Sequence, residues 1–155
     1  MMMLTWHIKF FKELTASQLY QILKLRQDVF IVEQTCLYAD ADNLDQKSLH
    51  AFLVSEEHDQ IVAYCRILPA GLVCDDVAIG RVVVAADFRQ QGLAKNLMEK
   101  AIHFIEQEMQ PEAIKVSAQS HLQAFYQSLG FQVISSPYDE DGIEHIDMLL
   151  HISHS

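Results

Sequence analysis

Hydrophobic and polar residues near the start of the chain alternate first with the period of a strand and then with that of a helix. In Trp6–Phe11 the apolar side chains fall on one face, which predicts a half-buried strand. Thr15, followed three residues later by Gln18, has the pattern of a capping box that begins a helix. Apolar residues then recur at helical spacing, so the helix is expected to continue to about Val32.

The middle of the chain contains three apolar runs that follow a polar, acidic loop over Glu33–Ser48. The runs Leu49–Ser55 and Ile61–Leu68 flank a short polar segment, which predicts an antiparallel hairpin. The third run, Val77–Ala85, is almost continuously apolar, and this pattern is typical of a strand that is buried on both faces.

The second half of the chain alternates helices and strands. One apolar stripe predicts a helix from about Gln91 to Glu108, and Pro111 follows its expected end. A strand over Ile114–Ala118 comes next. Ser120 and Gln123 then form a capping box, which predicts a short helix that ends at a left-handed Gly130. Two strands, Phe131–Ile134 and His145–His151, follow and are joined by the polar loop 135–144.

The predicted order is β-α-β-β-β-α-β-α-β-β, which indicates a mixed sheet with helices packed against it, an α/β or α+β fold. Residues 1–155 suit a single domain, and half of them are hydrophobic, which excludes intrinsic disorder. The formal net charge of −10 argues against a dedicated nucleic-acid binder, which should have a basic face.

Composition also bears on the compartment and on metals. The apolar runs are far shorter than the roughly 18 residues of a membrane-spanning helix, and the start of the chain lacks the pattern of a signal peptide. Three cysteines, Cys36, Cys65 and Cys74, form no C-x-x-C pair, so we expect reduced thiols in a cytoplasmic protein. The histidines are not paired with cysteines at zinc-site spacing, so no metal site is expected.

The segment with the clearest chemistry joins the apolar strand at Val77–Ala85 to the following helix. The first amides of a helix have no internal partner and lie at its positive end, so small residues there, such as Gly92 and Ala94, let a diphosphate approach the backbone. Residues 77–100 also carry a net charge of +2 in an acidic chain. From the residues alone a tight turn with solvated basic side chains remains the alternative, because the segment is neither a P-loop nor a dinucleotide-binding motif.

Two motifs in this order resemble the GNAT N-acetyltransferase superfamily. Arg89-x-x-Gly92-x-Ala94 is similar to its [Q/R]-x-x-G-x-[G/A] motif, and the segment 124–131 places a tyrosine, Tyr126, on a short helix that ends in Gly-Phe. The segment 25–42, with 121–123 and 141–145, further resembles the ElaA-like branch of these proteins.

The resemblance implies a GNAT-like α/β fold, with a central mixed sheet of about seven strands that splays between strands 4 and 5 and is flanked by helices. It implies acetyl-CoA as co-substrate and an amine as acceptor. The pantetheine arm would pair with the exposed backbone of Val82, Val83 and Val84. The diphosphate would bind around the helix start, at Arg89, Gln90, Gln91, Gly92, Leu93, Ala94 and Lys95. Ala94 and Gln90 stand where many members have glycine, and neither change removes a backbone donor.

The resemblance also assigns chemical roles. Tyr126 matches the position of the general acid that protonates the departing thiolate, and a backbone N–H near Val82 would stabilise the oxyanion. Glu33 is the preferred candidate for the base that deprotonates the amine, with His121 and His145 as rivals and solvent as a further alternative.

For contacts to the acceptor the candidates are Tyr38, Asp40 and Asp42, and acidic loops at the opening would attract cationic amines. The leading hypothesis is therefore an N-acetyltransferase that acts on a primary amine of a small molecule or peptide. The alternatives are a non-catalytic acyl-CoA-binding regulatory module and an interaction domain that does not use CoA. The family resemblance is also compatible with a homodimer.

Overall fold

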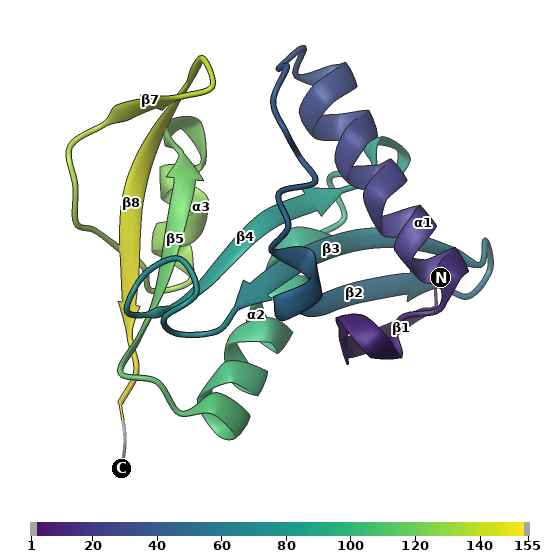
Figure 1. The fold of residues 1–155 in the computed structure, drawn as a ribbon, viewed down its shortest axis with the longest axis horizontal. Coiled ribbons are helices and arrows are strands. Elements are labelled where there is room, and N and C mark those ends of the chain that lie inside the picture. Colours follow the sequence, from purple (N-terminus) through teal and green to yellow (C-terminus); the bar gives the residue numbers. More distant parts are fainter. Residues whose placement is uncertain (1–2, 154–155) are drawn as a thin grey trace.

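An eight-stranded mixed sheet forms the centre of the computed structural model, which describes residues 3–153 (Figure 1). The strand order is β1-β2-β3-β4-β5-β8-β6, and β7 pairs with β8 outside this path. Only the neighbours β4 and β5 are parallel. The strands are β1 (Leu4–Phe10), β2 (Leu49–Ser55), β3 (Gln60–Leu68), β4 (Val77–Val84), β5 (Ala113–Gln119), β6 (Gln132–Val133), β7 (Tyr138–Glu140) and β8 (Ile143–His151).

Three helices cover the two faces of this sheet (Figure 1). Helix α1 (Ala16–Arg26) continues as a wider π-type turn over Gln27–Glu33, and α2 (Leu93–Phe104) continues in the same way over Ile105–Met109. Helix α3 (Gln123–Ser128) is short. The first helix begins as predicted, because Thr15 and Gln18 form both hydrogen bonds of the capping box.

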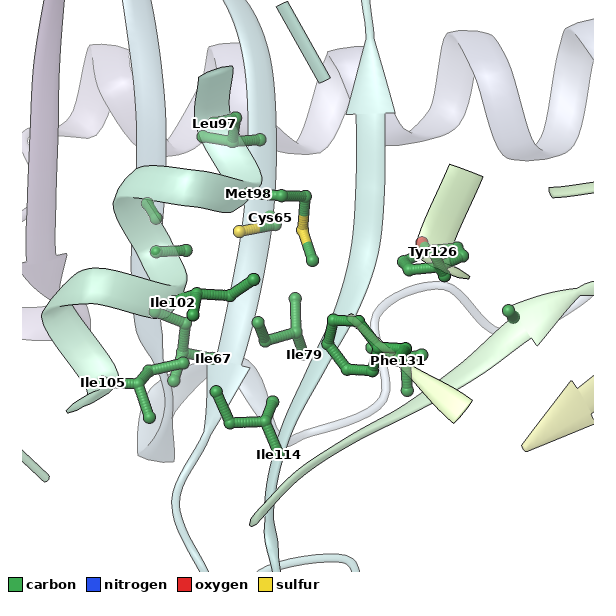
Figure 2. Packing of buried hydrophobic residues seen from close by; sticks show 14 of the residues in the cluster. Cys65, Ile67, Ile79, Leu97, Met98, Ile102, Ile105, Ile114, Tyr126 and Phe131 are labelled. Atoms are coloured by element: carbon green, nitrogen blue, oxygen red, sulfur yellow. The ribbon is translucent and has the colours of Figure 1, made fainter. Parts of the chain in front are cut away.

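Two apolar clusters attach the helices to opposite faces of the sheet. The larger one joins α2 and α3 to the sheet; Figure 2 shows the part with Met98 of α2, Ile79 of β4 and Ile114 of β5 packed together. The smaller one packs Ile22 and Leu25 of α1 against Phe52 and other residues of β2, β3 and β4. Burial of these side chains supplies the main stabilisation of the fold, at about 25 cal/mol per Å² of apolar surface.

The structure corrects three sequence-based expectations. The polar loop 135–144 contains β7, whose three residues form a strand through pairing with β8 and not through an apolar pattern of their own. Ser120 does not cap α3: its hydroxyl is buried without a hydrogen-bond partner in the described part of the chain. Strand β4 is buried at Val77–Ile79, but Gly80–Val82 and Val84 are only half-buried, because the sheet opens there.

The strand register shows where the sheet opens between β4 and β5 and what accompanies the opening. Parallel pairing stops at Ile79 and Val116. Directly after this point β4 contains a β-bulge, in which Arg81 and Val82 together lie opposite the single residue Cys65 of β3. A bulge bends its strand and increases the local twist, so β4 turns away from β5 while it stays paired with β3.

Candidate functional site

A cavity of about 1230 Å³ lies at the opening between β4 and β5 and receives residues from both faces of the sheet. On one side it is lined by the start of α2 and by α3. On the other side it is lined by the end of the first helix, the segment that follows it, and the hairpin between β7 and β8. The backbone of Val82, Val83 and Val84 lies between these two halves. A cavity of this size and place can hold an extended ligand that passes through the sheet.

One half of the cavity is built around the N-terminus of α2. Every residue from Arg89 to Lys95 except Gln91 lines the cavity. Gln90 and Gly92 have φ angles of +62° and +73°, so the turn into the helix is left-handed at both positions. Glycine tolerates this conformation without steric cost, which explains why the related motif often has glycine where this chain has Gln90. The amides of the first helical turn therefore face the cavity at the positive end of the helix.

An ion pair connects the two halves of the cavity. Arg89 donates from Nη1 to Glu33 Oε2 at 2.7 Å, and its Nε donates to the carbonyl of Val84 at 3.3 Å. The two charged side chains are 38% and 45% exposed, so solvent screens this pair and its net contribution is small. Glu33, the predicted base, and Arg89, a predicted diphosphate ligand, thus lie together at the cavity with their charges compensated.

Tyr126 lines the cavity from α3 while its ring belongs to the larger apolar cluster. The ring is only 5% exposed and packs edge-on against Phe125 and Phe131. Figure 2 shows Tyr126 and Phe131 in the apolar cluster. Burial raises the pKa of Tyr126, so the phenol carries its proton throughout the neutral range. A protonated phenol at a cavity wall can donate a hydrogen bond or a proton to a developing anion.

Both histidine rivals for the role of base line the cavity. His145 of β8 is 8% exposed, and its Nδ1 lies 2.8 Å from the carbonyl oxygen of Ile143, so Nδ1 carries a proton. Its Nε2 lies 3.4 Å from Glu140 Oε2. His121 also lines the cavity but is exposed to solvent.

Of the three residues predicted to contact the acceptor, Tyr38 lines the cavity, whereas Asp40 and Asp42 are not among the lining residues.

Asp40 and Asp42 belong to a closed ring of three arginines and three aspartates, which we call the Arg–Asp ring. Each arginine forms ion pairs with two of the aspartates, and each aspartate with two of the arginines, at N···O distances of 2.8 to 3.3 Å. The pairs are Arg26 with Asp40 and Asp45, Arg66 with Asp42 and Asp45, and Arg81 with Asp40 and Asp42. The ring is neutral as a whole. The arginines therefore hold the oxygens of Asp40 and Asp42, and a contact of these carboxylates with an acceptor stays a prediction.

The Arg–Asp ring makes the stability of the fold depend on pH in the acidic range. Burial alone favours the protonated form of Asp42, but hydrogen bonds from Arg66 and from the Leu44 amide, together with the charges of Arg66 and Arg81, lower its pKa to about 2. Burial likewise opposes ionisation of Asp45, and Arg26 and Arg66 outweigh it, so its pKa is also lowered. In the unfolded chain both carboxyls titrate near the ordinary value of about 3.9.

We therefore expect the free energy of unfolding to fall as the pH is lowered from about 4 to about 2. The stabilisation from a lowered carboxyl pKa is complete above the unfolded value and is lost as the folded group protonates. Urea unfolding followed at several pH values measures the slope. Asp42→Asn should make the slope shallower, because one titrating group is gone. An unchanged slope in this variant would contradict the assignment to Asp42.

Several cavity residues were not predicted, although the sequence carries a signal for most of them. Lys115, Ser117 and Gln119 line the cavity from the face of β5 that is turned away from the apolar cluster, which contains the alternate residues of this strand. Their polar spacing of two is visible in the sequence. Two arginines of the ring, Arg66 and Arg81, stand singly inside apolar runs, and an isolated charge in such a run indicates a buried partner. Arg26 has polar neighbours and carries no such signal.

Two further structural observations concern what the described residues do not contain. Within residues 3–153, no helix has both the length and the apolar character needed to cross a membrane. The same residues include no group of three or more histidine, cysteine, aspartate or glutamate side chains placed to hold a metal ion. Cys36, Cys65 and Cys74 are free thiols.

The fold and the cavity at its parallel strand pair define an acetyltransferase scaffold, and comparison with known proteins agrees. A family model described as an acetyltransferase (GNAT) domain matches residues 20–152. Because this match covers most of the chain, the chain belongs to the GNAT acetyltransferase family.

Particular relatives narrow the position within the family. Protein ElaA of Escherichia coli (strain K12) is 39% identical over 146 residues, which are 94% of this chain and 95% of ElaA. The crystal structure of Escherichia coli ElaA has a TM-score of 0.89 at 38% identity, covering 96% of this chain and 100% of that one. An acyl-CoA N-acyltransferase from Pseudomonas aeruginosa has the same TM-score and identity, with 96% and 99% covered. The resemblance to the ElaA-like branch and the predicted fold class are thereby confirmed.

Proposed function

We propose that this chain is an acetyl-CoA-dependent N-acetyltransferase, which transfers an acetyl group to a primary amine of a small molecule or peptide. The observation that carries the proposal is that one cavity joins three features: the part of β4 that is not paired with β5, the N-terminus of α2 and the phenol of Tyr126. Membership of the family supports a transferase. A GNAT family acetyltransferase from Elizabethkingia anophelis, 14% identical with a TM-score of 0.63, has acetyl-CoA bound in its structure.

The residues of the cavity fit the parts of acetyl-CoA by their chemistry. Val82, Val83 and Val84 would pair through their free backbone groups with the amides of the pantetheine arm, as an added strand does. The diphosphate would lie on the amides at the start of α2, with Arg89 and Lys95 as counter-charges. When bound, acetyl-CoA supplies the activated acyl group. No metal ion is needed for any of these contacts.

Transfer requires that the acceptor nitrogen bonds to the thioester carbon while the carbon–sulfur bond breaks. A backbone N–H near Val82 would stabilise the negative charge that develops on the thioester oxygen. Tyr126 would give its proton to the departing sulfur. Glu33 is proposed to take the proton from the amine. To do so it must break its ion pair with Arg89, and a diphosphate that binds Arg89 in place of Glu33 would promote this.

Three free thiols are consistent with action in the cytoplasm.

Calorimetric titration of acetyl-CoA into the purified protein tests the proposal first. We expect saturable binding with one site per chain, and much weaker binding of pantetheine, because pantetheine lacks the diphosphate and the nucleotide. Release of free thiol in the presence of a panel of amines then measures turnover. Absence of binding at millimolar acetyl-CoA would overturn the proposal. Binding without thiol release for any amine would favour a regulatory module that only binds acyl-CoA.

A further inference from the structure

Arg81 has a backbone conformation that an ordinary strand residue avoids. Its φ angle is +53°, in the left-handed region where a side chain is strained. Such a conformation persists only where the surroundings impose it, and it concentrates at functional sites. Arg81 is also one of the two residues of the β4 bulge, at the point where the sheet opens.

The side chain of Arg81 is held by the Arg–Asp ring. From Arg81, Nε donates to Asp40 Oδ1 at 2.8 Å, and Nη2 donates to Asp42 Oδ2 and to the Asp40 carbonyl, both at 3.3 Å. The guanidinium carbon also lies 5.2 Å from the centroid of the Tyr38 ring. These contacts fix the position of the planar guanidinium, and the backbone of Arg81 must adopt a conformation that is compatible with that position.

The ring itself is anchored by two buried arginines on other elements. Arg26 of α1 is fully buried and donates to Asp40 and Asp45 at 2.9 and 2.8 Å. Arg66 of β3 is 3% exposed and closes the ring by donating to Asp45 and Asp42. The strained residue on β4 is therefore tied through two carboxylates to a helix and to the neighbouring strand.

We infer that Arg81 is a positioning residue for the cofactor cleft: the Arg–Asp ring holds it in the left-handed conformation and so keeps the β4 bulge formed. The bulge turns Val82–Val84 away from β5, and their free backbone is the surface that the pantetheine arm would need. The inference rests on the proposed function and deepens it, because it assigns the opening of the cleft to a side chain that does not itself react. It also ties the Tyr38–Asp45 segment, on the acceptor side, to the geometry of the cofactor site.

Two substitutions at the same position separate this role from a general contribution to folding. Arg81→Gly and Arg81→Ala both remove the guanidinium, so the ring loses the same contacts in each. They differ in the backbone, because glycine adopts a φ of +53° at no steric cost and alanine is driven back towards extended backbone. We expect the dissociation constant of acetyl-CoA to rise less than about threefold in Arg81→Gly and at least about tenfold in Arg81→Ala.

The backbone amide resonances of Val82 and Val83 give a direct readout of the bulge. They should stay near their wild-type positions in Arg81→Gly and shift in Arg81→Ala. Equal losses of affinity, or tighter binding by the alanine variant, would overturn the inference while leaving the proposed function intact. If wild-type protein does not bind acetyl-CoA, the proposed function fails, and the inference fails with it.

A second pair of variants serves if the loss of the guanidinium prevents folding. Arg81→Lys and Arg26→Lys make the same chemical change in the same ring, but only Arg81 is at the bulge. We expect a clearly larger loss of acetyl-CoA affinity in Arg81→Lys than in folded Arg26→Lys, because Arg26 acts on the bulge only through Asp40. Equal effects of the two substitutions would contradict a positioning role for Arg81.

Discussion

Gly92→Glu is expected to abolish the binding of acetyl-CoA. Gly92 is the N-cap of α2 and has a φ of +73°, and a Cβ added there would meet no described atom within 4 Å. A glutamate at this position puts a carboxylate at the helix N-terminus, where the diphosphate would bind. Two like charges about 4 Å apart near a protein surface repel by about 4 kcal/mol, so affinity should fall at least about 100-fold in calorimetric titration.

Gly92→Gln is the matched control for this prediction. Glutamine has nearly the same shape as glutamate and suffers the same strain at a left-handed position, but it has no charge. We expect its affinity for acetyl-CoA to fall by about tenfold or less, because only the backbone strain remains. Equal losses in the two variants would show that shape and strain, and not an anion site, determine the result. Pantetheine, which lacks the diphosphate, should distinguish poorly between them.

Most of the fold could be predicted from the sequence because its elements have strong local patterns. Leu49–Ser55 forms β2 with the predicted bounds, and Gly130, with a φ of +101°, follows the end of α3 in left-handed backbone. Local patterns are less informative for short elements. Strand β7 is polar and obtains its structure from β8, and the wide turns that extend α1 and α2 depend on the tertiary contacts at the helix ends.

Local patterns alone predict the candidate site only where one contiguous segment builds it; Tyr126, which also lines the cavity, was predicted from the family resemblance. Residues 89–95 come from a single strand–turn–helix unit, so their motif already places them together. The Arg–Asp ring joins α1, the acidic loop, β3 and β4, with up to 41 positions between partners, and no local period reveals such contacts. For the same reason the acidic loop looked like a surface that attracts cations, whereas its aspartates neutralise buried arginines.

Tyr126→Phe is expected to lower turnover by roughly 100-fold and to leave the affinity for acetyl-CoA unchanged. Phenylalanine keeps the ring that packs against Phe125 and Phe131, so the cavity wall and the stability of α3 should be preserved. Only the hydroxyl is lost, and burial keeps that hydroxyl protonated by raising its pKa. The departing thiolate would then have to take its proton from water.

Thiol release and calorimetry on the same preparation separate the possible roles of Tyr126. Reduced turnover with unchanged affinity supports the general acid. Loss of affinity in proportion to turnover would instead assign Tyr126 to the binding of the cofactor. Wild-type turnover in the variant would show that the phenol only packs in the core, and the proton must then reach the sulfur by another path. Since the ring is 5% exposed and lines the cavity, the hydroxyl is the only part whose removal the core should tolerate without a change in packing.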